Sequence, residues 1–235
     1  MQPDAIKALF DQQAAGYDRQ WEKTAPIRQC LHFLLEPVLA GLPEEARVLC
    51  VGVGTGMEMA HLAGRFPGWR FTAVDPSERM LEVCRHRAEE AGFLDRCRFH
   101  AGYLDTLPAG PAHDAATCFL VSQFILDTAA RADFFRGIAR RLVPGGRLAS
   151  SDLAADTSSP EYAVLLEAWM RMMASADVAP EALERMRRAY AEDVGVLPPA
   201  QVEAILRAGG FERPVPFFQA GLIHAWVSTR APTPG

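Results

Sequence analysis

Three glycines at alternate positions carry the first chemical signal of the sequence. Gly52, Gly54 and Gly56 directly follow the apolar run 47–51 and precede a stretch, 57–66, in which apolar residues recur at helical spacing. A strand that turns sharply into a helix uses glycine because the backbone can then take unusual angles and a ligand can approach it closely. A nicotinamide-dinucleotide fingerprint, G-x-G-x-x-G, would need glycine where this chain has methionine, which argues against that cofactor class.

A carboxylate at the end of the next apolar run, 69–75, is the second signal. Asp75 ends this expected strand and precedes Pro76, so in isolation it could be a turn residue. In a parallel sheet, however, it lies at the same edge as the glycine turn, where a carboxylate can accept hydrogen bonds from both hydroxyls of an adenosyl ribose. The two signals together favour a site for an adenosyl group.

These residues need a sheet that brings strand ends together, and the apolar patterning predicts one. Alternating strands and helices predict a doubly wound α/β fold with a mostly parallel sheet. The expected strands are 47–51, 69–75, 96–101, 114–121 and 147–152, and the expected helices are 27–39, 57–66, one from Ser77 onward, and 131–142. After residue 152 come helices from Ser159 and from Pro180, a short helix at 201–208, and a terminal hairpin at 215–219 and 222–229. The strands of such a hairpin must be antiparallel.

The composition limits the class of protein. The chain has 235 residues, of which 49% are hydrophobic and 23% charged, which suits one globular domain spanning 1–235. The net charge of −5 argues against a nucleic-acid partner, although a local basic patch would be compatible with it. We find no long apolar stretch and no signal-peptide pattern, and therefore expect no membrane association and a cytoplasmic location. The five cysteines form no C-x-x-C pair, so we expect neither a metal site nor a disulfide framework.

Three segments together resemble the successive motifs of class I S-adenosylmethionine-dependent methyltransferases. They are Leu49–Gly56, Ala73–Ser77 with Met80 and Leu81 behind it, and Leu142–Leu148, within a resemblance that extends over residues 10–229. The resemblance implies a Rossmann-like, doubly wound sheet of seven mostly parallel strands with an antiparallel C-terminal hairpin. It also implies S-adenosylmethionine as cofactor, S-adenosylhomocysteine as product, and methyl transfer to a small molecule.

The family resemblance assigns roles to individual residues. Residues 102–104 are implied to border the adenine and residues 119–123 the methionine part of the cofactor. Residues 1–40 are implied to form an N-terminal helical lid, and residues 157–197 an inserted helical lid. The implied cofactor-binding residues are Gly52, Val53, Gly54, Gly56, Asp75, Pro76, Met80, Gly102, Tyr103, Leu104, Val121 and Gln123.

Two residues depart from the pattern of this family. Cys50 and Tyr103 each stand where family members commonly have an acid that helps to hold the cofactor. The amino group of the cofactor is then expected to rely on backbone carbonyls, such as those of Gly52 and Val121, or on water. The same departures also fit a third hypothesis, a non-catalytic adenosyl-binding protein, although the intact glycine turn and the apolar lid favour an enzyme.

The second half of the chain is also similar to carboxy-S-adenosylmethionine synthase. This similarity rests on residues 121–125, the two expected lid helices and residues 217–219. That enzyme carboxylates the methyl group of the cofactor for a tRNA modification and pairs the new carboxylate with an arginine on its second lid helix. Arg187 falls near that place on an apolar stripe with Tyr190. It could bind a carboxylate through two hydrogen bonds, or lay its stem on the core and reach solvent.

Methyl transfer needs an acceptor lone pair in line with the methyl–sulfur bond, and positioning supplies much of the acceleration. The residues expected on the acceptor side are Tyr17, Gln123 and Arg187. Weaker candidates are His61, His224 and Asp127. The lid residues expected to be core rather than acceptor contacts are Trp169, Met172 and Met173, and this methionine-rich lid could contribute to a homodimer interface. The fold accommodates oxygen, nitrogen, sulfur and carbon acceptors, so it does not identify the acceptor.

Overall fold

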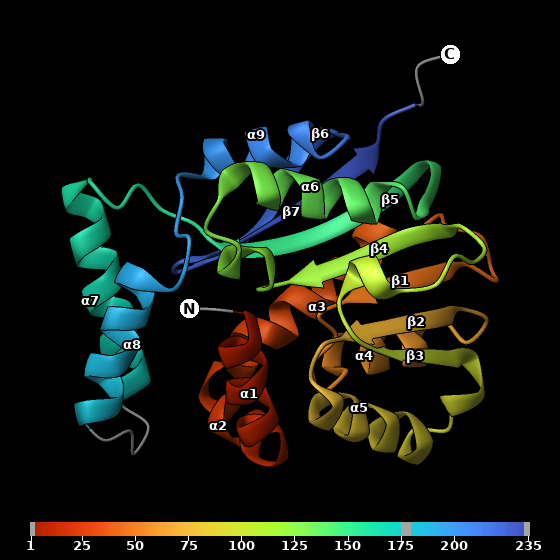
Figure 1. Ribbon diagram of the computed structural model, residues 1–235, viewed down its shortest axis with the longest axis horizontal. Coiled ribbons are helices and arrows are strands. Elements are labelled where there is room, and N and C mark those ends of the chain that lie inside the picture. Colours follow the sequence, from red (N-terminus) through yellow and green to blue (C-terminus); the bar gives the residue numbers. More distant parts are fainter. Residues whose placement is uncertain (1–2, 175–179, 233–235) are drawn as a thin grey trace.

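A seven-stranded sheet forms the centre of the computed structural model, which describes residues 3–174 and 180–232 (Figure 1). The strand order is β3-β2-β1-β4-β5-β7-β6. The strands are β1 (Arg47–Val51), β2 (Arg70–Asp75), β3 (Cys97–Ala101), β4 (His113–Phe119), β5 (Leu142–Leu153), β6 (Phe211–Ala220) and β7 (Ile223–Arg230).

The first five strands are parallel, and the last two form the expected hairpin. β7 pairs antiparallel with both β5 and β6, and the turn between β6 and β7 contains Gly221 at a φ of 55°. Val48–Val51 of β1 are all buried, as expected for a central parallel strand with both faces covered. The structure therefore confirms the predicted Rossmann-like, doubly wound α/β fold.

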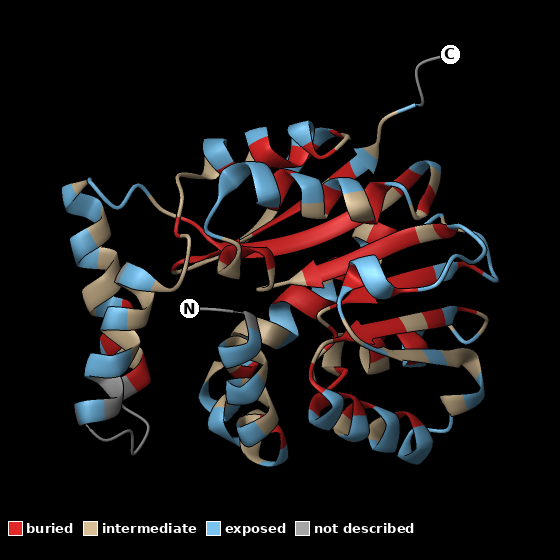
Figure 2. Cartoon of the chain, viewed as in Figure 1, coloured by how far each residue is buried: buried red, intermediate tan, exposed pale blue. Residues whose placement is uncertain are grey.

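Helices cover both faces of the sheet, and each face has its own apolar core (Figures 1 and 2). One core contains side chains of α3 (Ala25–Leu39), α4 (Met57–Arg65) and α5 (Glu78–Glu90). The other contains side chains of α6 (Thr128–Ala139) and α9 (Pro199–Ala208). Figure 2 shows the strands mostly buried and the helices exposed along their outer sides.

Two further helical pairs lie beyond the carboxyl ends of the strands (Figure 1). The N-terminal pair is α1 (Pro3–Gln13) and α2 (Tyr17–Gln20), and α1 packs against α5. The second pair is α7 (Pro160–Ala174) and α8 (Pro180–Glu192). Short 3-10 helices complete the chain at Ala14–Gly16, Glu22–Thr24, Leu94–Arg96, Leu104–Thr106 and Ser122–Phe124. None of the helices in the described part of the chain has the length and apolar character that crossing a bilayer requires.

Several element boundaries differ from the predicted ones for identifiable reasons. β4 ends at Phe119 instead of residue 121, because Leu120 has a φ of 57°. α6 begins earlier than predicted because the Asp127 carboxylate accepts a hydrogen bond from the Ala130 amide at 2.7 Å and so caps the helix. β5 begins at Leu142, since Leu142 pairs with His113 before a bulge in β4. The segment that reads as a Pro-Gly-Gly turn therefore lies inside the strand.

Candidate active site

A cavity of about 740 Å³ lies at the carboxyl ends of β1, β2 and β4. Its walls come from the glycine turn after β1, the end of β2, the turns after β3 and β4, the outer face of α6, and the N-terminal helices. Ten of the predicted site residues line it, namely Tyr17, Gly52, Gly54, Asp75, Pro76, Met80, Gly102, Tyr103, Leu104 and Val121. The structure thus brings together residues that are widely separated in the sequence.

The glycine turn needs glycine for two different physical reasons. Gly52 has a φ of 65°, and a Cβ placed on it would lie 2.3 Å from Cγ2 of Val121, so a side chain is excluded by both strain and contact. Gly54 has a φ of 54°, but a Cβ on it would meet nothing within 4 Å. The space over Gly54 opens into the cavity, which leaves room for a ligand to approach the backbone.

Asp75 contacts this turn directly and is nearly buried, at 7% exposure. Its Oδ2 accepts a hydrogen bond from the Gly54 amide at 2.8 Å, and its Oδ1 accepts one from the Ser77 amide at 2.9 Å. Burial raises the pKa of Asp75 to about 6, while the two backbone hydrogen bonds act in the opposite direction. A carboxylate held in this way retains lone pairs that can accept hydrogen bonds from vicinal hydroxyls.

The remaining wall of the cavity is largely apolar and aromatic. Phe10 of α1 makes edge-to-face contacts with Phe124 and Tyr17, with ring centroids 5.8 Å and 6.2 Å apart. Burial raises the pKa of Tyr17 to about 12, and the negative charges of Asp18 and Asp75 add to this shift. Tyr17 is therefore a neutral phenol at physiological pH and can donate a hydrogen bond, but it does not act as a base.

Polar contacts that the sequence did not reveal fix the N-terminal segment over the cavity. The Asp18 carboxylate accepts a hydrogen bond from the Thr55 hydroxyl at 2.7 Å and pairs with Arg87. Nearer the N-terminus, the Ser77 hydroxyl donates to Asp11 at 2.6 Å. The contacts with Thr55 and Ser77 join the segment to the two predicted cofactor motifs, and Arg87 joins it to α5. A local signal existed only for Ser77, which was expected to begin a helix and whose hydroxyl also accepts a hydrogen bond from the Met80 amide.

Two predicted cofactor residues lie behind the glycine turn and do not line the cavity. Val53 is 3% exposed and belongs to the core beneath α3, α4 and α5. Gly56 has a φ of 77° at the start of α4, and a Cβ on it would lie 2.4 Å from the Cys84 sulfur. Both residues therefore shape the turn from below and do not reach the ligand space. The departure at Cys50 has the same character, since this thiol is fully buried in the same core.

Gln123, which is expected from the sequence to bind the cofactor and shape the acceptor side, does not line the cavity. Its side-chain Oε1 accepts a hydrogen bond from the Leu153 amide at 2.8 Å, and its backbone oxygen accepts one from the Gly195 amide at 2.7 Å. The residue is 5% exposed and does not line the cavity. Its amide satisfies backbone groups where three segments of the chain meet, so it holds the turn after β4 in place.

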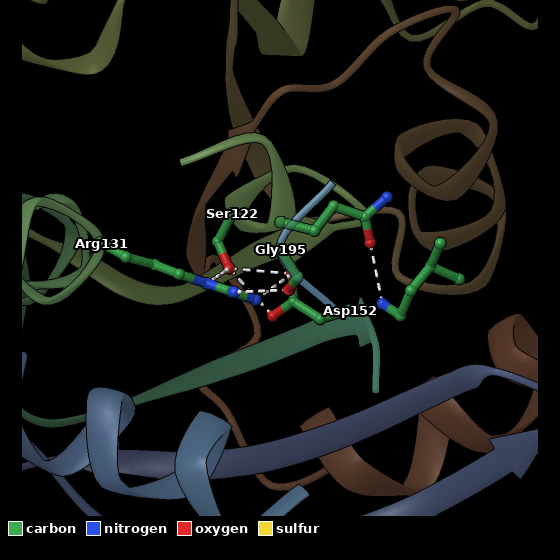
Figure 3. Close-up of polar contacts among 6 residues, drawn as sticks. Ser122, Arg131, Asp152 and Gly195 are labelled. Atoms are coloured by element: carbon green, nitrogen blue, oxygen red, sulfur yellow. Dashed lines mark hydrogen bonds and ion pairs between the residues drawn. The ribbon is translucent and has the colours of Figure 1, made fainter. Parts of the chain in front are cut away.

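A buried ionic network lies beside Gln123 (Figure 3). The Asp152 carboxylate pairs with Arg131 at 2.9 Å and accepts hydrogen bonds from the Ser122 hydroxyl at 2.8 and 2.9 Å. Arg131 also donates to the backbone oxygen of Gly195 at 3.1 Å. Burial raises the pKa of Asp152, and the positive charge of Arg131 opposes this shift. The network ties the turn after β4 to the segment that returns from α8.

Arg187 also lies away from the cavity. Its guanidinium pairs with the Glu167 carboxylate of α7 at 3.0 Å, and 40% of its side chain is exposed. Met186 and Tyr190 on the same helix pack against the apolar cluster that contains Trp169, and the Tyr190 hydroxyl accepts a hydrogen bond from the Trp169 indole at 2.9 Å. The structure gives Arg187 a role in joining α7 to α8, in agreement with the reading in which its stem covers the core and its head reaches solvent.

The weaker candidates have structural partners of their own. His61 lies 3.0 Å from Glu36, and His224 stacks on Trp226 in β7. Trp169 and Met173 are buried in a cluster with the ends of β5 and β7, against which Met172 also packs. Within residues 3–174 and 180–232, no three His, Cys, Asp or Glu side chains are grouped in a way that could hold a metal ion.

Residues 48–146 match the model of a methyltransferase domain. Erythromycin 3''-O-methyltransferase of Saccharopolyspora erythraea is 34% identical over 116 residues, which are 48% of this chain and 37% of that protein. Methyltransferase GfsG of Streptomyces halstedii is 30% identical over 153 residues, which are 64% of this chain and 54% of that protein. The chain therefore spans between about a third and somewhat more than half of the length of these relatives.

A solved structure shares the fold at lower sequence identity. The S-adenosylmethionine-dependent methyltransferase SibL, in its apo form, superposes with a TM-score of 0.63 over 86% of this chain and 54% of its own, at 23% identity. At this identity the likeness shows a common fold and carries no information on the acceptor.

Proposed function

We propose that the chain is a class I S-adenosylmethionine-dependent methyltransferase, as its match to a methyltransferase-domain model over residues 48–146 indicates, and that it transfers the cofactor's methyl group to a small-molecule acceptor. The observation that carries the proposal is the pairing of Asp75 with the open glycine turn at Gly54 on the wall of one cavity. The carboxylate suits vicinal ribose hydroxyls, and the open space over Gly54 suits a ligand that lies against the backbone.

The other cavity residues fit the remaining parts of the cofactor. Gly102, Tyr103 and Leu104 follow β3 and offer a surface for the adenine ring, and Met80 and Val121 lie on the same cavity wall. Backbone groups of the glycine turn are left to bind the amino acid end, because Cys50 is buried in the core. When bound, S-adenosylmethionine supplies an activated methyl group on a sulfonium.

The contribution of the chain is to position the acceptor and exclude water. Phe10, Tyr17 and Phe124 form an aromatic wall in which Tyr17 is a neutral hydrogen-bond donor. Well-oriented reactants gain about 7–11 kcal/mol from positioning alone, and a desolvated wall favours attack that neutralises charge. We propose that residues 1–40 and 157–197 act as lids over this site.

A small-molecule acceptor is favoured over a macromolecule by two observations. One relative carries the name of an erythromycin O-methyltransferase, and the net charge of this chain is −5. For carboxylation of the cofactor, a free arginine on α8 would be needed near the cavity, and Arg187 is instead paired with Glu167. No observation in the structure favours that second activity.

Mass spectrometry of ligand released from natively purified protein tests the proposal first. S-adenosylmethionine or S-adenosylhomocysteine in the released fraction supports it, whereas a species heavier by one carboxyl group would replace it with the carboxylating activity. Turnover of S-adenosylmethionine over a panel of small acceptors then separates an enzyme from a binding protein. Tight cofactor binding with no product across a broad panel would count against catalysis.

A further inference from the structure

A second cleft, of about 420 Å³, lies at the opposite edge of the sheet, around the amino ends of β1–β4. In Figure 1 the strand arrows point away from this edge and toward α1 and α2. The cleft is strongly basic in a chain whose net charge is −5. Its charged lining consists of six arginines and one acid, namely Arg47, Arg70, Arg96, Arg98, Arg140, Arg141 and Asp95.

Two of these arginines are built into the framework without being neutralised. Arg96 donates hydrogen bonds to the backbone oxygens of Ala63, Phe66 and Trp69, at 3.1–3.2 Å. Arg141 donates in the same way to the backbone oxygens of Leu104 and Leu107. A carbonyl oxygen satisfies a guanidinium N–H but carries no formal charge. Both arginines are therefore fixed in place and leave their positive charge in the cleft.

The other four arginines are exposed, and within the described part of the chain they form no side-chain ion pair. They are Arg47, Arg70, Arg98 and Arg140. Exposed arginines elsewhere, such as Arg79 and Arg207, each pair with a glutamate on their own helix. The nearby Asp114 carboxylate accepts a hydrogen bond from the Arg47 backbone amide. Like Asp95, it reduces the local positive charge by one unit and leaves a clear excess.

The strand register places like charges side by side. Arg47 and Arg70 are direct partners in the parallel pair β1–β2, and Arg98 is the partner of Thr72 on the next strand. Like charges directly opposite each other on neighbouring strands are destabilising. An anion bound beside Arg70 would relieve this repulsion.

The uncharged part of the cleft comes from the segment 107–112, which is Leu-Pro-Ala-Gly-Pro-Ala. The Arg98 guanidinium passes close to Gly110, where an added Cβ would lie 3.6 Å from its Nη1. This is an ordinary van der Waals distance, so the guanidinium lies against the loop. The cleft thus combines arginine guanidinium groups with a small apolar wall. Its volume lies within the usual range for small-molecule sites, about 300–1,000 Å³.

We propose that this cleft binds a small organic phosphate, with Arg70 and Arg98 holding the phosphate or pyrophosphate group and the segment 107–112 contacting the uncharged part. Guanidinium forks match phosphate oxygens in geometry and make charge-assisted hydrogen bonds with them. The site is separate from the glycine turn and Asp75, although Arg140 and Arg141 line both cavities. It does not depend on the function proposed above.

Isothermal titration calorimetry with inorganic pyrophosphate and with UDP tests this site, because neither probe contains the adenosyl group. The double variant R70S/R98S is compared with R185S/R188S, which removes the same charge from exposed arginines of α8. We expect both probes to bind the unmodified chain and R70S/R98S to weaken them at least about tenfold, a loss of about 1.4 kcal/mol. R185S/R188S should stay within about twofold, and saturating S-adenosylhomocysteine should leave binding unchanged.

The affinities of the cleft for pyrophosphate and for UDP show which kind of phosphate it binds. Tighter binding of UDP than of pyrophosphate supports a phosphate ester whose uncharged part contacts the segment 107–112, and equal binding of the two probes would overturn that contact. Failure of both probes to bind, equal weakening in both double variants, or competition by S-adenosylhomocysteine would overturn the proposal. A single-stranded oligonucleotide that binds through Arg70 and Arg98 while UDP does not would also overturn it, in favour of a nucleic-acid surface.

Discussion

Arg131 and Asp152 form an ion pair of 2.9 Å in which each side chain is only 1% exposed. Arg131 lies on α6 and Asp152 near the end of β5, and both contact the Ser122 hydroxyl in the turn after β4. This turn continues into the cavity wall at Phe124, while Gly195, bonded to Arg131, follows α8. One buried ion pair therefore joins the cavity wall of the candidate site to the segment that follows the helical pair α7–α8.

Removal of one partner of this pair is expected to destabilise the fold strongly. Arg131→Met leaves the Asp152 charge buried without compensation, so we expect the free energy of unfolding to fall by about 3–5 kcal/mol. Urea unfolding measures the loss, with Arg136→Met as a control, since Arg136 is an exposed residue of the same helix paired with Asp133. The control should change by less than about 1 kcal/mol. A double variant R131M/D152L should recover much of the loss, and equal losses in R131M and the control would refute this role.

Asp75 is expected to contribute directly to cofactor binding. Asp75→Ala should weaken S-adenosylhomocysteine by about 1.5–3 kcal/mol, or roughly 10- to 150-fold, the scale of hydrogen bonds to a charged group. Calorimetric titration measures the affinity, and a thermal melt checks that the variant is folded. Asp156→Asn removes the same charge from an exposed position outside the cavity and should leave the affinity unchanged. An unchanged affinity in folded D75A would remove Asp75 from the site.

The raised pKa of Asp75 predicts a pH-dependent affinity. Its carboxyl titrates at about 6 in the ligand-free chain, and hydroxyl donors bind the charged form better than the neutral acid. Binding of S-adenosylhomocysteine should therefore be strongest above pH 6 and weaken as the pH falls below it, by up to about tenfold per pH unit. Asp75→Asn cannot titrate and should flatten this profile. A decline that persists in the folded D75N variant would assign the titration to another group, such as Glu58, whose pKa burial raises to about 7.

The fold could be predicted from the sequence because its signals are local. Apolar periodicity located the strands, and the glycine turn and Asp75 were recognisable because each combines a residue type with its place at a strand end. Their place on one cavity wall follows from the parallel sheet alone. The β5 boundary was wrong because a bulge beside His113 lets a Pro-Gly-Gly segment remain in the strand, and such a bulge leaves no local pattern.

The tertiary contacts of the site could not be predicted in the same way. Asp18 meets Thr55, and Arg131 meets Asp152, across long separations in the chain. Nothing in the spacing of a single sequence marks such partners. Gln123 was placed on the acceptor side because it follows β4, whereas the backbone amide of Leu153 binds its side chain. Family resemblance located a turn that lines the cavity but not the direction of this side chain.

The two glycines of the turn should respond differently to alanine. Gly52→Ala meets both a positive φ and the Val121 side chain, so we expect a loss of about 2–5 kcal/mol in the free energy of unfolding. Gly54→Ala meets only the positive φ, which costs about 1–2 kcal/mol, but its methyl group projects into the cavity. Gly54→Ala should therefore lose more affinity for S-adenosylhomocysteine, relative to its loss of stability, than Gly52→Ala. Denaturant unfolding and calorimetry on the same two proteins measure both quantities, and equal stability losses with an unchanged affinity in G54A would contradict the assigned approach of the cofactor.

The contact between Asp18 and Thr55 is expected to hold Tyr17 over the cavity. The Thr55 hydroxyl donates to Asp18 at 2.7 Å, and Arg87 pairs with the other carboxylate oxygen. Asp18→Asn removes the charge that both partners recognise, so residues 14–20 should exchange their amide hydrogens faster while the sheet keeps its protection. Glu22→Gln makes the same change of charge at an exposed residue of the same segment and should leave the exchange rates unchanged. Because the glycine turn and Asp75 stay intact, D18N should keep most of its affinity for S-adenosylhomocysteine. Its turnover rate should fall more than its affinity, as expected for a segment that orders the acceptor side. Exchange that is equally fast in D18N and E22Q would show that the segment is held by its apolar contacts alone, with Phe10 and Phe124 as the contact to alter next.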